Sequence, residues 1–351
     1  MKHLPQLDGL RALAVLMVLA HHVFHAPVLW AGVDLFFVLS GFLITGILLR
    51  DCERMGFGSM LGQFYLRRAQ RILPAYILFL GIAAFFVGHE LRALWPYYAF
   101  FLQNVPYAFG RTPTPLTPLW SLAVEQHFYL VWPVLVFFAP RRWLGWILVA
   151  IVLSEPVLRA VATPCFSSYD AMYMLTPFRL DTLAAGALAA LWLPKVNPQR
   201  AGRWSIALMM AAAVAYLLLV HGHPWFHREA NSRAFNALGY SLNLTLLGGL
   251  FVWLVAAPAS WLARLLSTAG LRWLGRISYM FYLLHVLVMV EVEKRVHGSV
   301  AVFFVTLGVT AALASLSWMA VERPILRWRR RRTAEGLVGE GAARAQISVR
   351  S

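Results

Sequence analysis

The sequence predicts an all-α fold: a polytopic membrane bundle of about ten transmembrane helices with both termini in the cytoplasm. Composition is the first reason. Of the 351 residues, 60% are apolar and only 13% are charged, about half the charged share of an ordinary soluble domain. The mean hydropathy of +0.65 is the second, because one water-soluble core cannot bury so much apolar surface. Together they exclude a soluble globular enzyme and a disordered chain.

Apolar stretches of about 17 to 22 residues, long enough to cross the hydrocarbon layer as helices, follow one another along the chain. They lie at 9–27, 31–49, 72–88, 119–139, 143–161, 176–194, 203–221, 236–256, 277–293 and 299–320. Segment 93–105 is short and rich in aromatic residues, so we interpret it as interfacial or re-entrant. Residues 1–325 are therefore predicted to form one membrane domain, and residues 326–351 a basic, mobile cytoplasmic tail.

The net charge of +16 is explained by membrane topology rather than by nucleic-acid binding. Basic residues collect at the cytoplasmic ends of membrane helices, where anionic headgroups also favour them. With ten spans and an inner N-terminus, most of the 31 basic residues fall inside. Making 93–105 a span would move most of them outside. We therefore expect both termini inside, membrane lipids as partners and no nucleic acid.

The cysteine and histidine patterns do not predict a metal site. Cys52 and Cys165 fall in loops that we place across the bilayer from each other, so they cannot pair. The spacing of His221, His223 and His227 can hold a metal, but no acidic ligand is obvious, and an outer solvent loop explains them.

Titratable side chains inside the apolar stretches are the candidates for function, because ionisable groups at membrane depth are costly and usually face a cavity or a partner. Arg11 and His22 lie on one face of the first helix, about 16 Å apart along its axis, which puts His22 toward the outside. Asp34 and Glu125 are expected at a similar depth in the second and fourth helices. The same polar layer takes in three further groups, in substrate-binding or structural roles: Arg179, Asp181 and His285.

This layer contains the parts of a general base. A neutral imidazole is the commonest base near pH 7, and a carboxylate at its other nitrogen fixes the tautomer and stabilises the imidazolium. His22 with Asp34 or Glu125 suits removal of a proton from a hydroxyl that then attacks an activated acyl group. Arg11 or Arg179 can neutralise the developing oxyanion. The alternative is a set of structural ion pairs that lock the helices together.

A second cluster lies at the predicted inner mouth of the third helix, where FYLRRAQRILPAY contains Arg67, Arg68 and Arg71. Arg68 and Arg71 are three apart and share a helix face. Clustered guanidinium groups can bind phosphates, although the positive-inside bias alone also produces such runs. An inner phosphate site combined with an outer base suits a long donor whose charged head stays inside while its reactive arm passes through the bundle.

Seven ordered motifs, from residue 5 to about 332, resemble those of acyltransferase family 3, the bacterial integral-membrane acyltransferases that modify surface polysaccharides. They are LDGLRALAVLMVLAHHV, GVDLFFVLSGFLIT, FYLRRAQRILPAY, LWSLAVEQHFYLVWP, FRLDTLAAGALAAL, LGRISYMFYLLHVLV and VERPILRWRRR. Arg11 and His22 match the family's signature of Arg, ten residues and His, in which the His is regarded as catalytic. Arg68 and Arg71 match its Arg, two residues, Arg signature, associated with the acyl-coenzyme A donor. Glu125 matches the first of two acids in a family motif, whose second acid is replaced here by Gln126.

The resemblance implies an O-acetyltransferase of the bacterial inner membrane, with acetyl-coenzyme A as donor, an extracytoplasmic or lipid-linked saccharide as acceptor, and no metal. A small natural product or a glycolipid is the alternative acceptor. Two alternatives come from other classes: a secondary transporter, which would tend to show inverted repeats that we do not find, and a non-catalytic scaffold of a polysaccharide assembly system.

Overall fold

The structure, a computed structural model, describes residues 4–327. Throughout that range the chain forms helices and no β-strand, which confirms the predicted all-α class. The predicted tail, residues 326–351, lies outside the described residues except for Leu326 and Arg327.

The α-helices of the described chain are joined by short turns and 3-10 helices. They are α1 (Pro5–Phe24), α2 (Gly32–Cys52), α3 (Phe57–Ala93), α4 (Trp95–Ala99), α5 (Asn104–Ala108), α6 (Leu119–Phe138), α7 (Arg141–Ala162), α8 (Tyr169–Met174), α9 (Leu180–Trp192), α10 (Pro198–Gly222), α11 (Tyr240–Ala256), α12 (Trp261–Leu266), α13 (Ala269–Glu293) and α14 (Ser299–Ser317). The 3-10 helices are η1 (Leu29–Ala31), η2 (Thr114–Leu116), η3 (Thr163–Cys165), η4 (Thr176–Phe178), η5 (Leu193–Lys195) and η6 (Arg228–Ala230), and π-helical turns cover η7 (Phe235–Gly239) and η8 (Trp318–Glu322).

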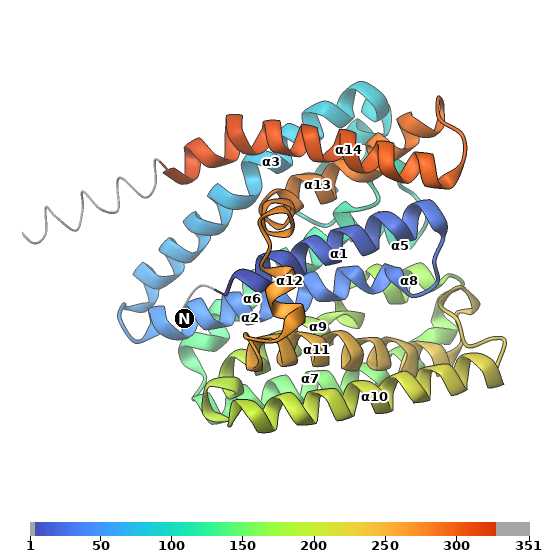
Figure 1. Cartoon of the computed structure of the whole chain (residues 1–351). Coiled ribbons are helices and arrows are strands. Elements are labelled where there is room, and N and C mark those ends of the chain that lie inside the picture. The colour runs from blue at the N-terminus through green and yellow to red at the C-terminus, as the bar shows by residue number, and fades with distance from the viewer. Residues whose placement is uncertain (1–3, 328–351) are drawn as a thin grey trace, which may run out of the picture.

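Nine helical segments within residues 4–327 are long and apolar enough to cross a membrane, and they match nine of the ten predicted stretches. The long helices run side by side (Figure 1). Their outward faces keep large apolar side chains exposed, for example Phe85 at 89%, Leu218 at 69% and Trp146 at 68%. Contiguous apolar surface of this kind is costly in water, so lipid is its solvent.

The sixth predicted stretch, 176–194, forms a shorter helix than the sequence predicts. Prolines shorten it at both ends, because Thr176–Phe178 and Leu193–Lys195 are 3-10 turns that each contain one. The remaining helix, α9, has 13 residues and rises about 20 Å, less than the ~30 Å hydrocarbon layer. Its buried residues place it in the bundle interior, against α2.

Two glycines make the contact between α2 and α9 possible. A Cβ at Gly41 would collide with the backbone carbonyl of Leu183, and a Cβ at Gly186 would collide with that of Val38. The two backbones therefore touch at both positions, as small residues allow in membrane bundles.

The two ends of the bundle carry different residues. At one end, called the basic end below, α1 begins, α2 ends and α3 begins; at the other, the far end, α1 ends and α2 begins. The start of α1 and the last turns after α14 both lie at the left of Figure 1, on the side of the basic end. Which side of a membrane this end faces stays a prediction. Segment 93–105 contains α4 and the start of α5, helices of five residues each that are too short to span.

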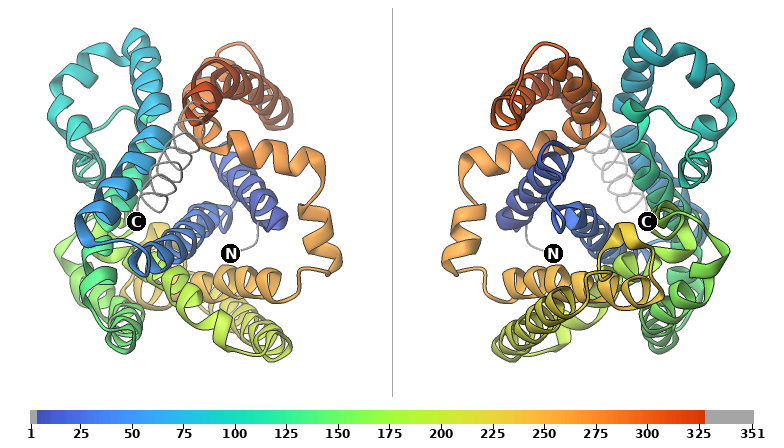
Figure 2. Two further views of the ribbon diagram at one scale, coloured as in Figure 1. Left: turned by 90° about the vertical axis from the view of Figure 1, so that its left-hand side faces the viewer. Right: turned by 90° about the vertical axis from the view of Figure 1, so that its right-hand side faces the viewer.

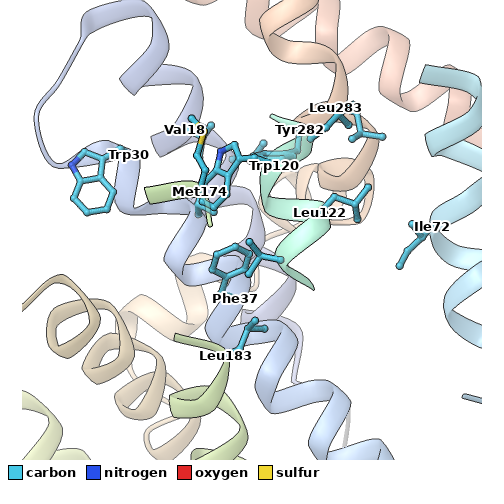
Figure 3. Packing of buried hydrophobic residues seen from close by; sticks show 14 of the residues in the cluster. Val18, Trp30, Phe37, Ile72, Trp120, Leu122, Met174, Leu183, Tyr282 and Leu283 are labelled. Carbon is cyan, nitrogen blue, oxygen red and sulfur yellow. The ribbon is translucent and has the colours of Figure 1, made fainter. Parts of the chain in front are cut away.

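The candidate polar residues lie among the helices at the centre of the bundle. The α2 and α13 segments are the most deeply buried of the candidate spans. Figure 2 looks along the bundle and shows α1 and α2 enclosed by the helices that follow them in the chain. Near the far end, Val18, Trp120 and Met174 pack together and Phe37 lies below them (Figure 3). This apolar packing fixes the helices that carry the candidate site.

Candidate active site

His22 stands in the last turn of α1 at the far end. Val18, His21, His22 and His25 follow the 3, 4, 7 spacing of one helix face, and all four line the same cavity, of about 520 Å³. The helix ends here because His25 adopts a left-handed conformation, with φ of 52°. No hydrogen bond of the His22 ring is found within residues 4–327, which leaves its nitrogens available to a ligand.

The far-end cavity is assembled from segments distant in the sequence. Besides the face of α1, its walls include two acids, one arginine and several aromatic rings: Trp30, Trp120, Tyr169, Asp170, Tyr173, Arg228, Glu229 and Tyr282. The pKa of the Glu229 carboxyl lies below its ordinary value: partial burial acts against this, but a backbone hydrogen bond and the charge of Arg228 outweigh it. Concave walls with aromatic surfaces and a few polar groups are typical of small-molecule sites.

His285, on α13, lies directly behind His22. The two ring centroids are 5.2 Å apart, and the His285 side chain is fully buried. Its Nδ1 lies 2.6 Å from the carbonyl oxygen of Tyr282, which can only accept, so the neutral ring donates from Nδ1. Its Nε2 is then a buried acceptor without a partner in the described chain. The structure thus brings together His22 and His285 from the predicted layer.

Asp34 does not meet His22, which corrects the expected pairing across the first hairpin. It is fully buried and accepts a hydrogen bond from Nη2 of Arg179. The Arg179 guanidinium also lies over the rings of Tyr173 and Tyr240, at 5.3 and 5.0 Å. A buried carboxylate is stabilised far more by a permanent guanidinium than by a neutral imidazole, so Arg179 outcompetes His22.

Asp181 belongs to a second buried ion cluster, centred on Arg159. Nη1 of Arg159 donates to Asp181 at 2.8 Å and to Glu155 at 3.3 Å. Backbone carbonyls of Phe178 and Asn236 accept from the same guanidinium at 3.0 and 2.8 Å. The sequence analysis missed Arg159 and Glu155, although charges four apart inside the apolar stretch 143–161 were a visible signal. This cluster joins α7 to α9.

Glu125 lies outside the far-end cavity that His22 lines, which corrects the expectation that it partners the base. It lines a second cavity, called the basic-end cavity below. Its carboxylate accepts hydrogen bonds from the hydroxyls of Ser40 at 2.6 Å and Tyr129 at 3.3 Å. The predicted depth of Glu125 was therefore too close to the far end. The first turn of α6 reaches the far-end cavity through Trp120, while Glu125, more than one turn later, faces away from it.

The basic-end cavity, of about 110 Å³, gathers three arginines. Arg11 from α1 and Arg68 and Arg71 from α3 line it together with Glu125. Arg11 also pairs with Asp8 at 3.5 Å. The Nε of Arg68 is buried and has no hydrogen-bond partner within residues 4–327. A cationic cavity with an unsatisfied guanidinium donor fits phosphate groups. Arg11 therefore lies with the phosphate-binding candidates and not beside His22.

Arg67 turns away from this cavity. Its Nη2 donates to the carboxylate of Asp51 in the last turn of α2, so the pair ties α3 to α2. Arg68 and Arg71 are three apart and share the cavity-facing side of α3, whereas Arg67 lies on another side. The inclusion of Arg67 in a donor site is not supported by its position.

Tyr282 lies between the two cavities, whereas its sequence position suggested only interfacial or bundle packing. Its side chain lines both of them, and its hydroxyl lies 2.9 Å from the hydroxyl of Ser121. Ser121 in turn lines the basic-end cavity and donates to the carbonyl of Pro118 at 3.2 Å. One aromatic side chain therefore forms part of the wall of both the arginine-lined cavity and the His22 cavity.

No group of three or more His, Cys, Asp or Glu side chains in residues 4–327 is arranged to hold a metal ion. His221 lies at the end of α10 and bonds the carbonyl of Leu217, and His223 stacks on Trp225. His227 contacts Glu229 at 3.4 Å.

Comparison with known proteins gives consistent matches over nearly the whole chain. A family profile described as "Acyltransferase domain" matches residues 4–319. The peptidoglycan O-acetyltransferase of Listeria monocytogenes is 31% identical over 92% of this chain and 56% of its own length. A putative O-acetyltransferase of Staphylococcus aureus is 30% identical, over 94% and 59%. A putative peptidoglycan O-acetyltransferase of Bacillus subtilis is 30% identical, over 92% and 55%. The chain thus spans little more than half the length of these relatives, and no solved structure matches it.

Proposed function

Because the chain belongs to the acyltransferase-domain family, we propose that it is a membrane O-acetyltransferase that moves an acetyl group from acetyl-coenzyme A to a hydroxyl of an extracytoplasmic or lipid-linked saccharide. The observation that carries this proposal is the position of Tyr282, whose side chain lines both the arginine cavity and the His22 cavity. Two sites of different chemistry, separated by one side chain, suit a reaction between substrates that arrive from opposite ends.

The donor is assigned to the basic end. Arg11, Arg68 and Arg71 supply the charge and the guanidinium donors that nucleotide phosphates need. Coenzyme A has a thin pantetheine arm, which can follow the bundle interior while the phosphates stay at the arginines. Glu125, bonded to Ser40, lines the same cavity as these arginines. Movement of the Tyr282 ring then exposes the thioester to the far-end cavity.

The acceptor is assigned to the far-end cavity. Its volume of about 520 Å³ lies within the range of small-molecule sites. Rings such as Trp120 and Tyr173 offer flat surfaces to a sugar ring, and the Asp170 and Glu229 carboxylates accept hydrogen bonds from its hydroxyls. The relatives named as peptidoglycan O-acetyltransferases favour a glycan of N-acetylated amino sugars as this acceptor.

His22 is assigned the role of general base. It takes the proton of the acceptor hydroxyl while the hydroxyl oxygen forms a bond to the thioester carbonyl carbon. The carbon–sulfur bond then breaks, the sulfur leaves with the electron pair, and the proton held by His22 goes to that sulfur. His285 replaces the acid that we expected beside the base, since its unprotonated Nε2 is a buried acceptor next to the His22 ring.

The test is transfer of labelled acetyl from acetyl-coenzyme A to an N-acetylglucosamine oligomer in membranes that contain the protein. We expect product with the unaltered protein and almost none with His22→Ala or Arg68→Ala at equal amounts of inserted protein. Arg142→Ala is the matched control, because Arg142 is an exposed arginine at the start of α7 outside both cavities. Undiminished product with His22→Ala would contradict the assigned base. Labelled acetyl on a glycolipid or a small secreted compound instead would replace the acceptor class, and no transfer at all would favour a transporter or a scaffold.

A further inference from the structure

The loop between α10 and α11 places Arg228 against the far end of α1. Arg228 begins the short helix η6 and is only 7% exposed, although it lies in a connecting segment. Its guanidinium carbon stands over three rings, those of Trp30, Tyr169 and Tyr173, at 5.2, 4.9 and 4.8 Å. Such cation–π contacts are strongest where water is excluded.

Hydrogen bonds fix the remaining freedom of this guanidinium. Its Nε and Nη2 donate to Oε1 of Glu229 at 3.3 and 3.1 Å. A guanidinium held by rings on its faces and by a carboxylate at its edge loses little conformational entropy when it makes one further hydrogen bond. Arg228 is thus a rigid donor rather than a mobile surface cation.

The further bond goes to His21, the neighbour of His22. Nη2 of Arg228 lies 3.4 Å from Nε2 of His21. An arginine can only donate, so Nε2 of His21 accepts and its proton sits on Nδ1. That Nδ1 lies 2.9 Å from the carbonyl oxygen of Ala26 and donates to it. One chain of bonds therefore joins the η6 loop, the last turn of α1 and the turn that follows it.

The last turn of a helix is where its backbone is least restrained, because its carbonyls lack partners within the helix. His22 stands in that turn, and its ring lies 5.5 Å from the ring of His21. We infer that Arg228 is a positioning residue for His22: through His21 it holds the end of α1 so that the His22 ring keeps its place in the far-end cavity. This inference rests on the proposed function, since it gives His22 the role of base.

A positioning role differs measurably from acceptor binding. Displacement of a catalytic group by about 1 Å can cost on the order of 100-fold in rate while binding is retained. Loss of Arg228 should therefore lower kcat and leave KM nearly unchanged for both substrates. Arg228 also lines the cavity, and direct contact with the acceptor would instead raise the acceptor KM.

The experiment is steady-state acetyl transfer to an N-acetylglucosamine oligomer by the full chain in proteoliposomes. For Arg228→Ala we expect kcat to fall about tenfold or more, with both KM values within about twofold. Arg228→Lys, which keeps a cation and a donor, should recover part of kcat. Arg233→Ala is the matched control: it removes the same charge from an exposed position of the same loop and should leave kcat unchanged.

A double substitution tests the route through His21. If both residues act through one chain of bonds, Arg228→Ala with His21→Ala should cost no more than the larger single loss. His21→Gln keeps an acceptor on the side chain and should retain more activity than His21→Ala, which provides a test even if Arg228→Ala fails to insert.

Three results would overturn the inference: a raised acceptor KM with unchanged kcat, fully additive losses, or unaltered kinetics of Arg228→Ala in a protein whose His22→Ala variant is inactive. An unaltered protein that transfers no acetyl would instead contradict the proposed function.

Discussion

The hydroxyls of Tyr282 and Ser121 lie 2.9 Å apart at the boundary between the two cavities. Tyr282 is further held by an edge contact with Phe36, with ring centroids 5.7 Å apart, and its backbone carbonyl binds His285. The residue therefore connects the wall of the basic-end cavity to the histidine pair. In the proposed reaction, this position makes the Tyr282 ring the barrier between the donor and water at the far end.

Removal of the Tyr282 ring should uncouple the two half-sites. In Tyr282→Ala the cavities merge, so water from the far end reaches the thioester, and we expect acetyl-coenzyme A hydrolysis without acceptor to rise several-fold while acetyl transfer falls. Tyr282→Phe keeps the ring, loses only the Ser121 bond and should hydrolyse little. The release of free thiol without acceptor measures this. Equal hydrolysis by the unaltered protein and Tyr282→Ala would show that Tyr282 is not the barrier.

Substitutions of the arginines of α3 should have different kinetic effects, because only some of these side chains face the basic-end cavity. Arg68→Ala removes a guanidinium from the basic-end cavity, and we expect the KM for acetyl-coenzyme A to rise about tenfold with the acceptor KM unchanged. Arg67→Ala breaks the part-buried pair with Asp51 and a bond to Gln63, both outside that cavity, and should change that KM by less than about twofold. Initial rates at varied donor concentration measure both. The reverse order of effects would contradict the assignment of the cavity.

The Asp34–Arg179 pair should be a determinant of stability. Asp34→Asn leaves a buried guanidinium without its counter-charge, a loss of about 3 to 5 kcal/mol where such pairs have been broken. Glu53→Gln, at an exposed acid of the basic end, should cost less than about 1 kcal/mol. Thermal unfolding in detergent measures the difference. The Tm of His22→Ala should lie close to that of the unaltered protein. A Tm of Asp34→Asn equal to that of Glu53→Gln would disprove the stabilising role of the Asp34–Arg179 pair.

The close approach of α2 and α9 should depend on Gly186. In Gly186→Ala the new methyl group collides with the backbone carbonyl of Val38, which cannot move aside as a flexible side chain does. We expect little folded protein. Gly81→Ala is the matched control, because its Cβ meets no atom within 4 Å, and the change should be neutral or stabilising by less than about 1 kcal/mol. The yield of monodisperse protein in detergent distinguishes the two, and equal yields would contradict the packing.

Composition and apolar length were sufficient to predict the membrane helices, because both follow from the thickness of the hydrocarbon layer. They did not predict that the helix within 176–194 would be as short as the 13 residues of α9, since α9 is buried against α2 rather than spanning the hydrocarbon layer. The prolines beside it, Pro177 and Pro194, were visible, but prolines also occur inside the long helices α3, α6 and α7.

The position of a polar residue along its helix predicted the end of the bundle at which it lies better than it predicted the residues that it contacts. His22 and the pair of Arg68 and Arg71 fall at opposite ends as expected. The partner of Asp34 depends on the rotation of α2 about its axis, which spacing along the chain does not determine. His285 was expected in the same polar layer as His22, and the two rings do lie side by side. Arg228 contacts His21 across more than 200 positions of the chain, which a single sequence does not reveal.

The most direct test of the account is a sided transfer measurement in sealed proteoliposomes that enclose an N-acetylglucosamine oligomer. Labelled acetyl-coenzyme A is added only outside, and the protein population whose basic end faces outward is selected. We predict that labelled acetyl appears on the enclosed oligomer and that His22→Ala abolishes it. Label on the oligomer only when both substrates share one compartment, or at an unchanged rate with His22→Ala, would contradict transfer between the two cavities.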